Sequence, residues 1–452
     1  MRCVAIIERP WRAPDEVLAA FAEEPWACAF LSGGGSARAR WSYLLRQPVQ
    51  TLALAGDDPA DAFEALEALL GEPLPAGDGP PFQGGPPFQG GLAGLACYEL
   101  GDRVEPLALA RRGQWPDLAV GLYPALLAFD HEQGRVLAIG RGGDAGEARA
   151  RAEDAAGWLD LAAPTRREGP LAVSFEAPLP AQAYEEAVAE VVGRIEAGEI
   201  FQANIARIWH GRLAQGAAPV DLLRRLTGDS PAPFAAYLRL EDRAVVSNSP
   251  ERFVTVAGGA APVVETRPIK GTRPRGRDAA EDTALAAELL ASDKDRAENL
   301  MIVDLMRNDL ARVCPAGSVA VPELFKVESF ANVHHLVSTV TGRLAPGLTA
   351  ADLLRAAFPP GSVTGAPKVQ AMKVIAGLEP PRGPYCGAMF WAGFDGGFDS
   401  NVLIRTVALT QQGDGWRFEA RAGAGIVADS DPHAERLETE AKIAALKRAL
   451  TS

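Results

Sequence analysis

The chain has 452 residues, of which 48% are hydrophobic and 23% are charged, a composition typical of a globular protein. This length exceeds what one hydrophobic core usually supports and favours two domains. The formal net charge of −13 argues against nucleic acid or an anionic membrane as the main partner.

The cysteines and the apolar runs indicate the compartment. The five cysteines are widely spaced and include no CxxC pair, which predicts reduced thiols without a disulfide framework or a zinc site. The N-terminus turns polar too early for a signal peptide, and no apolar run reaches membrane-spanning length. We therefore expect a cytoplasmic protein.

Short apolar runs bounded by turn residues dominate the first third of the chain. Runs such as residues 3–7 and 120–129 predict β-strands, and segments 58–70 and 147–161 have the pattern of helices. We therefore predict a β-rich N-terminal subdomain over residues 1–165.

The patterns are sharper in the second predicted domain, over residues 180–452. Residues 184–196 have the apolar spacing of an amphipathic helix, and residues 199–209 have the pattern of a strand. In that strand Gln202 and Asn204 share one face, which is unusual for paired amides unless the face meets something polar. Strands and helices mix without strict alternation, so the predicted fold class is α+β with antiparallel sheets.

A lysine lies at a conformationally restricted position in the segment 265–276. Pro268 fixes its own backbone, and Gly271 permits a tight turn just after Lys270. Nearby arginines would lower the pKa of Lys270 and leave its amine free to act as a nucleophile or base. A solvated surface lysine is the alternative, and for this segment alone it is the better interpretation.

Two acidic pairs occur on predicted helices. Asp295 and Glu298 are three residues apart on the helix 293–310, and Glu435 and Glu438 are three apart on the helix 432–450. This spacing places both carboxylates of a pair on one helical face, and two such faces across a cleft would suit Mg²⁺. Solvated helix charge is the alternative for either pair taken alone.

Several polar residues are candidates for binding or proton transfer. Arg405, Lys368 and a predicted glycine turn at 423–425 could bind carboxylates. His335 is a candidate acid, base or hydrogen-bond donor, with a satisfied core histidine as the alternative. Glu251 follows a proline in a short turn and is the best candidate for a lone general acid.

Seven segments together carry a family resemblance. They are residues 249–253, 267–272, 298–313, 334–339, 358–372, 404–406 and 423–430. In this order they resemble the chorismate-utilising enzymes, most densely over residues 180–450. The resemblance implies two large packed antiparallel β-sheets with helices on the outside, as in anthranilate synthase component I, and an Mg²⁺-dependent site that takes chorismate.

The resemblance also implies a role for each matching residue. Glu298 and Glu438 resemble the metal ligands, with Asp295 and Glu435 in support, and Glu251 would protonate the departing 4-hydroxyl. His335 is counted with the catalytic groups. The implied substrate contacts are Gln202, Thr364, Tyr385, Arg405, Gly423, Ala424, Gly425 and Lys442.

Two positions indicate the branch of the family. Isochorismate-forming relatives have a lysine where this chain has Gln202, and anthranilate synthases have an alanine where it has Lys270. The chain thus resembles the aminodeoxychorismate synthases, which make 4-amino-4-deoxychorismate for p-aminobenzoate and folate. Lys270 would attack C2 of chorismate, and ammonia would then attack C4 and expel the lysine.

Partners and regulation are implied less fully. No cysteine lies in the glycine-rich elbow of a glutaminase, so the resemblance implies a separate glutaminase subunit that supplies ammonia. Some relatives bind tryptophan at a strand pair resembling residues 30–43. The sequence does not decide whether this chain has such a tryptophan pocket. An anthranilate synthase component I and a non-catalytic subunit that binds chorismate or tryptophan are the alternatives.

Overall fold

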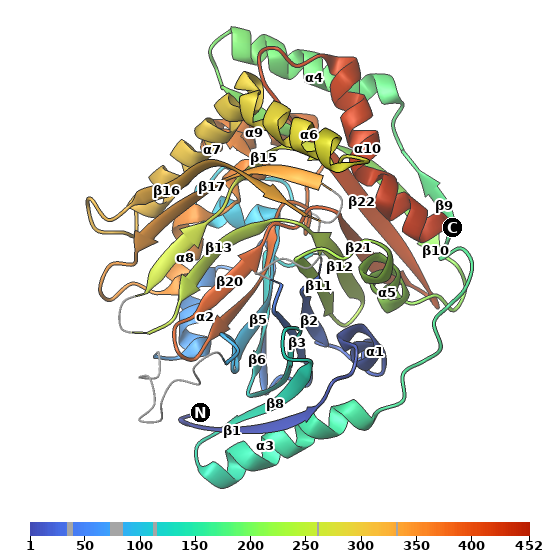
Figure 1. The fold of residues 1–452 in the computed structure, drawn as a ribbon, viewed down its shortest axis with the longest axis vertical. Helices are drawn as coiled ribbons and strands as arrows, with labels where there is room; N and C mark the ends of the chain where they lie inside the picture. The colour runs from blue at the N-terminus through green and yellow to red at the C-terminus, as the bar shows by residue number, and fades with distance from the viewer. Residues whose placement is uncertain (34–38, 73–84, 112–114, 260–261, 331–332) are drawn as a thin grey trace.

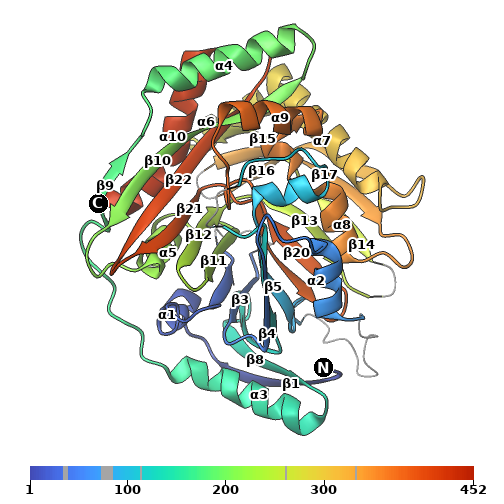
Figure 2. The ribbon, with the colours of Figure 1, turned by 180° about the vertical axis from the view of Figure 1, so that it is seen from behind.

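The computed structural model describes residues 1–33, 39–72, 85–111, 115–259, 262–330 and 333–452. Two large antiparallel β-sheets pack together, with helices on the outside (Figure 1, Figure 2). The predicted fold class, α+β with two packed antiparallel sheets, is confirmed. None of the helices in these ranges is both long and apolar enough to cross a membrane.

The first sheet contains twelve strands among the described residues, and β9 (Ala172–Glu176) joins it by pairing with β10. The others, in spatial order, are β1 (Cys3–Pro10), β8 (Arg135–Gly142), β7 (Ala125–Asp130), β3 (Trp41–Leu45), β2 (Cys28–Leu31), β11 (Phe234–Arg239), β12 (Arg243–Ser249), β21 (Thr406–Gln412), β22 (Gly415–Ile426), β10 (Gln202–Leu213) and β18 (Gly365–Ala366).

The second sheet contains ten strands in the same ranges, and β16 (Ala320–Ser329) joins it by pairing with β17. The others, in spatial order, are β15 (Ile269–Pro274), β17 (Val333–Arg343), β14 (Val263–Thr266), β13 (Arg252–Ala257), β20 (Phe398–Asn401), β19 (Ala388–Gly393), β5 (Gly91–Ala96), β6 (Leu118–Tyr123) and β4 (Gln50–Leu54).

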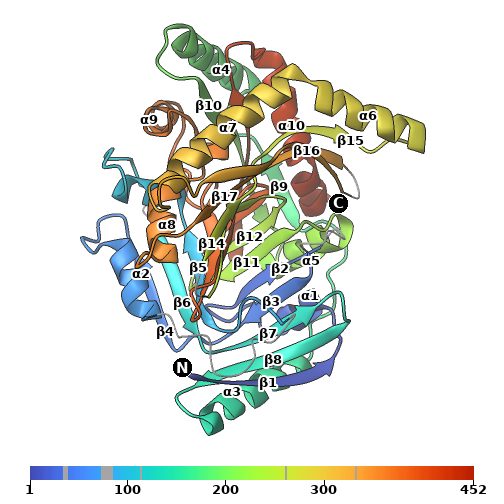
Figure 3. The ribbon, with the colours of Figure 1, turned by 60° about the vertical axis from the view of Figure 1, so that its left-hand side comes forward.

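The helices lie around the two sheets, with α3 beneath β1 and β8 (Figure 3) and with α4 and α10 next to β22 (Figure 2). They are α1 (Pro14–Ala19), α2 (Ala62–Leu70), α3 (Ala145–Gly157), α4 (Ala181–Glu196), α5 (Pro219–Asp229), α6 (Ala279–Ala291), α7 (Asp293–Ala311), α8 (Ala350–Ala357), α9 (Lys368–Leu378) and α10 (Pro432–Thr451). Short 3-10 turns occur at η1 (Tyr98–Arg103), η2 (Trp158–Asp160) and η3 (Gly361–Val363).

Side chains of both sheets meet in the interior. One apolar cluster joins Leu45 and Ala236 of the first sheet to Leu95 and Met389 of the second, all fully buried. Burying a leucine or methionine side chain contributes about 2 kcal/mol. This packing holds the two sheets together.

Both sheets contain strands from both halves of the chain. In the first sheet β2 pairs with β11, and in the second β5 pairs with β19. Main-chain hydrogen bonds therefore join residues 1–165 to residues 180–452 in both sheets. The division of the chain into these two domains stays a prediction.

Gly423–Gly425 do not form the predicted turn. They lie inside β22, where Gly423 pairs with Ala206 and Gly425 pairs with Asn204 of β10. A Cβ at Gly425 would lie 2.3 Å from the Gln202 amide nitrogen, and one at Gly423 would lie 2.7 Å from Asn204 Oδ1. These glycines are needed because the amides of β10 lie against their Cα atoms.

Candidate active site

A cavity of about 790 Å³ opens where β10 and β22 of the first sheet approach β15, β17, α7 and α10. Most of the predicted site residues line it: Glu251, Lys270, Asp295, Glu298, His335, Tyr385, Arg405, Gly423, Gly425, Glu435, Glu438 and Lys442. Gln202, Thr364 and Ala424 are fully buried next to this wall.

Lys368 does not line the cavity. Its Nζ donates to Asp309 Oδ2 at 2.7 Å and to the Ala357 carbonyl at 2.6 Å. Lys368, the first residue of α9, is thus bound by the buried carboxylate of Asp309 on α7, so its prediction as a substrate clamp is wrong.

Lys270 projects from β15 into the cavity, next to Gly271 with a φ of +83°. Burial lowers its pKa, Glu298 opposes that change, and Lys442 adds to it. Among the described residues Lys270 Nζ has no hydrogen-bond or ion-pair partner within bonding distance. A half-buried amine with a lowered pKa and no partner suits a nucleophile.

The predicted cause of this shift is wrong: each arginine of the segment is paired with a carboxylate, and none is among the causes of the lowered pKa of Lys270. Arg267 is bonded to Glu328. Arg273 donates to Glu288 at 2.8 Å, and Arg275 donates to Asp282 at 2.7 Å. Removal from water and the charge of Lys442 replace them as the origin of the lowered pKa.

Glu251 lies in the turn between β12 and β13 and is 7% exposed. Its Oε1 accepts a 2.7 Å hydrogen bond from Ser362 Oγ. Burial raises the pKa of Glu251, while Ser362 and Lys270 oppose the change. A carboxyl group with a raised pKa can keep its proton closer to neutral pH and suits a general acid.

His335 projects from β17 and is 6% exposed. Its Nδ1 lies 3.0 Å from Thr272 Oγ1. Burial and then Arg405 lower the pKa of His335 to about 4, so the ring is neutral at neutral pH. It can therefore act as a hydrogen-bond donor or as a base, and it cannot supply a positive charge.

Arg405 and Tyr385 face the cavity from segments with unusual backbone. Arg405 and Cys386 have φ values of +51° and +62°, in the left-handed region that side chains rarely adopt. The two segments are joined by the bond from Cys386 N to Leu403 O, at 2.9 Å. No ion pair to Arg405 occurs within the described parts of the chain, so its guanidinium is free to bind a carboxylate.

The four predicted metal-binding carboxylates lie in the first two turns of α7 and α10. Ser292 caps α7, and Asp431 caps α10 through a 2.7 Å bond from the Ala434 amide. Both helices begin at the cavity, so the helix dipoles favour negative charge there.

Each carboxylate has different surroundings. Asp295 pairs with Arg273 at 3.3 Å, Glu435 accepts from Ser430 Oγ at 2.7 Å, and Glu438 pairs with Lys442 at 2.6 Å. Burial raises the pKa of Glu298, where Lys270 opposes it. Burial also raises the pKa of Glu438, but Lys442 and Lys270 outweigh it and the net pKa is lowered.

The donor set fits Mg²⁺ in chemical type, because all four groups are carboxylates on two facing helices. The described residues contain no group of three or more His, Cys, Asp or Glu side chains already gathered closely enough to hold a metal ion. The repulsion that Glu298 experiences from Asp295 and Glu435 is the kind of electrostatic cost that a bound cation would relieve.

The amides of β10 are unsatisfied. Neither polar atom of the Gln202 side chain has a hydrogen-bond partner among the described residues, and Asn204 Oδ1 has none either. The Gln202 amide nitrogen and Lys270 Nζ both lie close to Gly425, at 2.3 and 3.1 Å from the point that a Cβ on this glycine would occupy. A buried amide without a partner costs free energy, which a bound polar ligand would recover.

Three of the lining residues that were not predicted carry a signal in the sequence. Ser362 lies within the segment 358–372 that carries part of the resemblance. Lys294 precedes Glu298 by four residues, so it shares a helical face with it. Arg421 lies two residues before Gly423 and four before Gly425, so the period of a strand places all three on one face.

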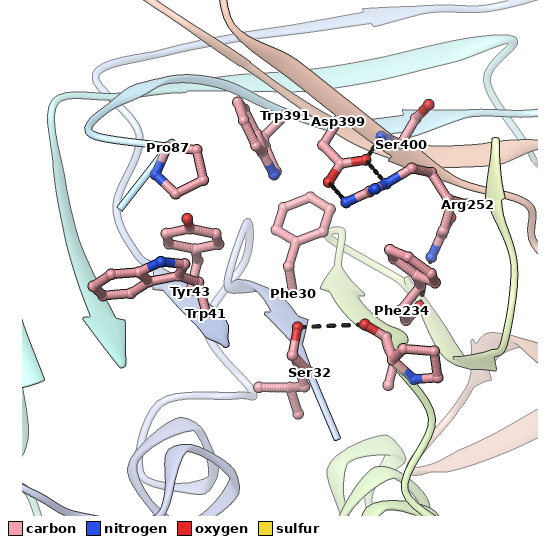
Figure 4. Close-up of a pocket in the computed structure, with 14 residues that line it drawn as sticks. Phe30, Ser32, Trp41, Tyr43, Pro87, Phe234, Arg252, Trp391, Asp399 and Ser400 are labelled. Atoms are coloured by element: carbon pink, nitrogen blue, oxygen red, sulfur yellow. Dashed lines mark hydrogen bonds and ion pairs between the residues drawn. The ribbon is translucent and has the colours of Figure 1, made fainter. Parts of the chain in front are cut away.

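A smaller pocket of about 100 Å³ lies at β2 and β3, the strand pair expected at residues 30–43 (Figure 4). Aromatic residues such as Tyr43 and Trp391 and the Arg252–Asp399 ion pair surround it (Figure 4). It shares no lining residue with the large cavity. Residues 34–38 lie outside the described residues, and whether tryptophan binds here stays open.

The comparisons with known proteins agree with this geometry. A family model described as chorismate binding enzyme matches residues 28–448. Aminodeoxychorismate synthase component 1 of Salmonella typhimurium is 41% identical over 97% of this chain and 96% of its own length. Anthranilate synthase component 1 of Streptomyces coelicolor is 41% identical over 91% of this chain and 81% of its own.

A solved structure is similar as well. Anthranilate synthase component I from Streptococcus pneumoniae has a TM-score of 0.77 at 29% identity, over 91% of this chain and 93% of that one. The chain therefore belongs to the family of chorismate-binding enzymes. Overall sequence identity does not distinguish an aminodeoxychorismate synthase from an anthranilate synthase. The distinction therefore depends on the residues of the site.

Proposed function

We propose that the chain is component I of an Mg²⁺-dependent aminodeoxychorismate synthase, which converts chorismate and ammonia to 4-amino-4-deoxychorismate. The observation that carries this proposal is Lys270, an amine with a lowered pKa that faces the cavity near Glu251 and Glu298. A site that only binds chorismate needs no such nucleophile.

The reaction takes two displacements. Lys270 attacks C2 of chorismate with its lone pair, the two conjugated ring double bonds shift to C1=C6 and C4=C5, and the 4-hydroxyl leaves as water with a proton from Glu251. Ammonia then attacks C4, both double bonds shift back, and the lysine amine leaves from C2. A covalent intermediate divides one difficult substitution into two easier ones.

The remaining residues orient the substrate. Arg405 and Tyr385 would bind the enolpyruvyl carboxylate with the β22 backbone at Gly423–Gly425. Glu298 and Glu438 would hold Mg²⁺, with Asp295 and Glu435 supporting them. When bound, Mg²⁺ would neutralise the ring carboxylate.

The ammonia would come from a separate glutaminase subunit. Burial raises the pKa values of Cys28, Cys97, Cys314 and Cys386, so these thiols are poor nucleophiles. The component 1 named for the Salmonella relative implies a further component, and such a subunit would supply ammonia directly to the cavity.

Product identification with an ammonium salt tests the proposed function. Purified protein is incubated with chorismate, Mg²⁺ and ammonium, and the products are separated by chromatography. We expect 4-amino-4-deoxychorismate. Anthranilate as the main product would overturn the proposal in favour of the alternative that the Streptomyces coelicolor relative supports. Chorismate binding by calorimetry without turnover would instead indicate a non-catalytic subunit.

A further inference from the structure

A cluster of buried charges reaches from the cavity wall, at Arg421, to the layer directly behind it and takes no part in the reaction above. It contains Glu379 and Arg382, in the loop between α9 and β19, and Arg421 of β22. Their side chains are 3%, 1% and 1% exposed. Burying charged groups is costly unless each is paired and hydrogen-bonded, so their place at the site requires a reason.

Arg382 connects three segments of the cavity wall. Its guanidinium donates to the Asn204 carbonyl of β10 at 2.6 Å and to the Val363 carbonyl of η3 at 3.0 Å. It also lies 5.8 Å from the centre of the Tyr385 ring. Asn204, Val363 and Tyr385 all line the cavity, although Arg382 itself does not.

Glu379 completes the connection to β10. It accepts from both the Nε and the Nη2 of Arg382, at 3.1 and 3.0 Å. Its Oε1 also accepts a 2.7 Å bond from the Ala206 amide. The pair therefore holds β10 at the carbonyl of residue 204 and at the amide of residue 206.

The main chain of the loop is fixed from its other side. Arg421 donates to the carbonyls of Pro380 and Pro381, at 3.2 and 2.6 Å. Glu99 accepts from the amides of Arg382 and Gly383, at 2.6 and 2.9 Å. These bonds fix the main chain of residues 380–383, which directly precedes Tyr385 in the chain.

We propose that the Glu379–Arg382 pair is a positioning element for the substrate, because it sets the place of Tyr385 relative to Asn204 and Val363. The ligand in this inference is chorismate, so the inference rests on the proposed function. Arg382 touches neither the substrate nor a reacting group and acts through the cavity wall. Removal of the pair should therefore weaken productive substrate binding more than it weakens the fold.

The test uses a double substitution because Arg382→Met alone would leave the buried charge of Glu379 with only its longer, 3.6 Å ion pair to Arg421. In Arg382→Met/Glu379→Gln the glutamine can still accept from the Ala206 amide. Arg40→Met/Asp130→Asn is the matched control, since Arg40 and fully buried Asp130 form a two-bond pair, each bond 2.9 Å, away from the cavity. Steady-state rates with chorismate, Mg²⁺ and ammonium are measured together with urea unfolding midpoints.

We expect the Arg382→Met/Glu379→Gln protein to have a raised KM for chorismate. Its kcat/KM should fall by about a hundredfold, because a displaced cavity wall would misplace the bound substrate. Its urea midpoint should fall no further than that of the control pair, whose KM should not change. An unchanged KM and kcat/KM, or equal kinetic losses in the control pair, would overturn the positioning role.

A second measurement does not depend on that variant. Arg382→Ala leaves a space next to a small pocket lined by Tyr98 and Glu99. Guanidinium at millimolar concentration should restore kcat/KM, whereas equal sodium chloride should not. Equal effects of the two salts would contradict the inference. The product is identified separately, with the unsubstituted protein. Anthranilate as that product would refute the proposed function, and the ratio of the KM values of the variants to that of the unsubstituted protein would still test the positioning role.

Discussion

At the scale of single residues, the raised pKa of Glu251 links activity to stability. Burial disfavours its ionised form, so the folded protein loses stability as the pH rises from the unfolded pKa through the higher folded pKa. Glu251→Gln removes this cost. We predict that the variant is more stable than the original protein at neutral pH and equally stable below the unfolded pKa, as measured by urea unfolding across pH.

The same substitution removes the proposed proton donor. We expect the rate of chorismate consumption to fall by roughly 10²- to 10⁴-fold, the usual contribution of a general acid. A variant with an unchanged rate would show that another group protonates the leaving hydroxyl.

Glu438 should be needed for Mg²⁺ binding. We predict that Glu438→Gln raises the Mg²⁺ concentration needed for half-maximal activity by about a hundredfold, since a direct ligand should matter at least as much as the outer groups that support one. Glu440→Gln is the control, because Glu440 pairs with Arg207 and Arg436 and does not line the cavity. Calorimetric Mg²⁺ titration gives an independent measurement, and a normal titration of the Glu438→Gln protein would refute the ligand role.

Most individual site residues could be predicted because collinear motifs name them one by one. The partners and burial of these side chains could not be predicted in this way. The pKa of Lys270 is lowered by burial and Lys442 instead of by the neighbouring arginines, since sequence proximity does not show which carboxylates pair with Arg267, Arg273 and Arg275. Lys368 was misassigned for the same reason, because its partner Asp309 lies on another helix.

At the scale of elements, the close contact between β10 and β22 gives a prediction. Gly425→Ala would place a methyl group 2.3 Å from the Gln202 amide nitrogen and 3.1 Å from Lys270 Nζ. We expect an activity loss of about a hundredfold from the displaced lysine. Gly193→Ala on α4 meets nothing within 4 Å and should leave activity unchanged while stabilising the helix by up to about 1 kcal/mol. Full activity of Gly425→Ala would contradict the placement of Lys270.

The sequence periodicity predicted where the helices lie more reliably than it predicted whether a glycine-rich segment is a turn or a strand. The helix predicted at 293–310 corresponds to α7 (Asp293–Ala311), and that at 432–450 corresponds to α10 (Pro432–Thr451). The glycines of β22 indicated a turn because glycine usually disfavours a strand. Only the partner strand, with Gln202 and Asn204 lying over those glycines, explains why they are in β22.

At the scale of the whole molecule, the shared sheets predict mutual dependence of the two chain segments. Residues 180–452 alone would lack β2 beside β11 and β5 beside β19. We expect this fragment to aggregate or to lack a cooperative urea transition, and to fold when residues 1–165 are coexpressed. A cooperative transition of the fragment alone would support two independent domains.

The pairing between distant strands could not be predicted from patterns. Alternation identifies a strand and its buried face, but it does not show that β2 pairs with β11 about two hundred residues later. The resemblance supplied the arrangement of two packed sheets, and the residue patterns alone reached only α+β with antiparallel sheets.

The central claim is that Lys270 forms a covalent bond with the substrate. Protein mixed with chorismate and Mg²⁺ without ammonia is quenched rapidly and digested, and the peptide that contains Lys270 is analysed by mass spectrometry. We predict an adduct on Lys270 with the mass of chorismate less one water. It should be absent from the Lys270→Ala protein, whose aminodeoxychorismate formation should fall by about a thousandfold or more. Rapid turnover by Lys270→Ala, with no adduct on the original protein, would contradict the claim.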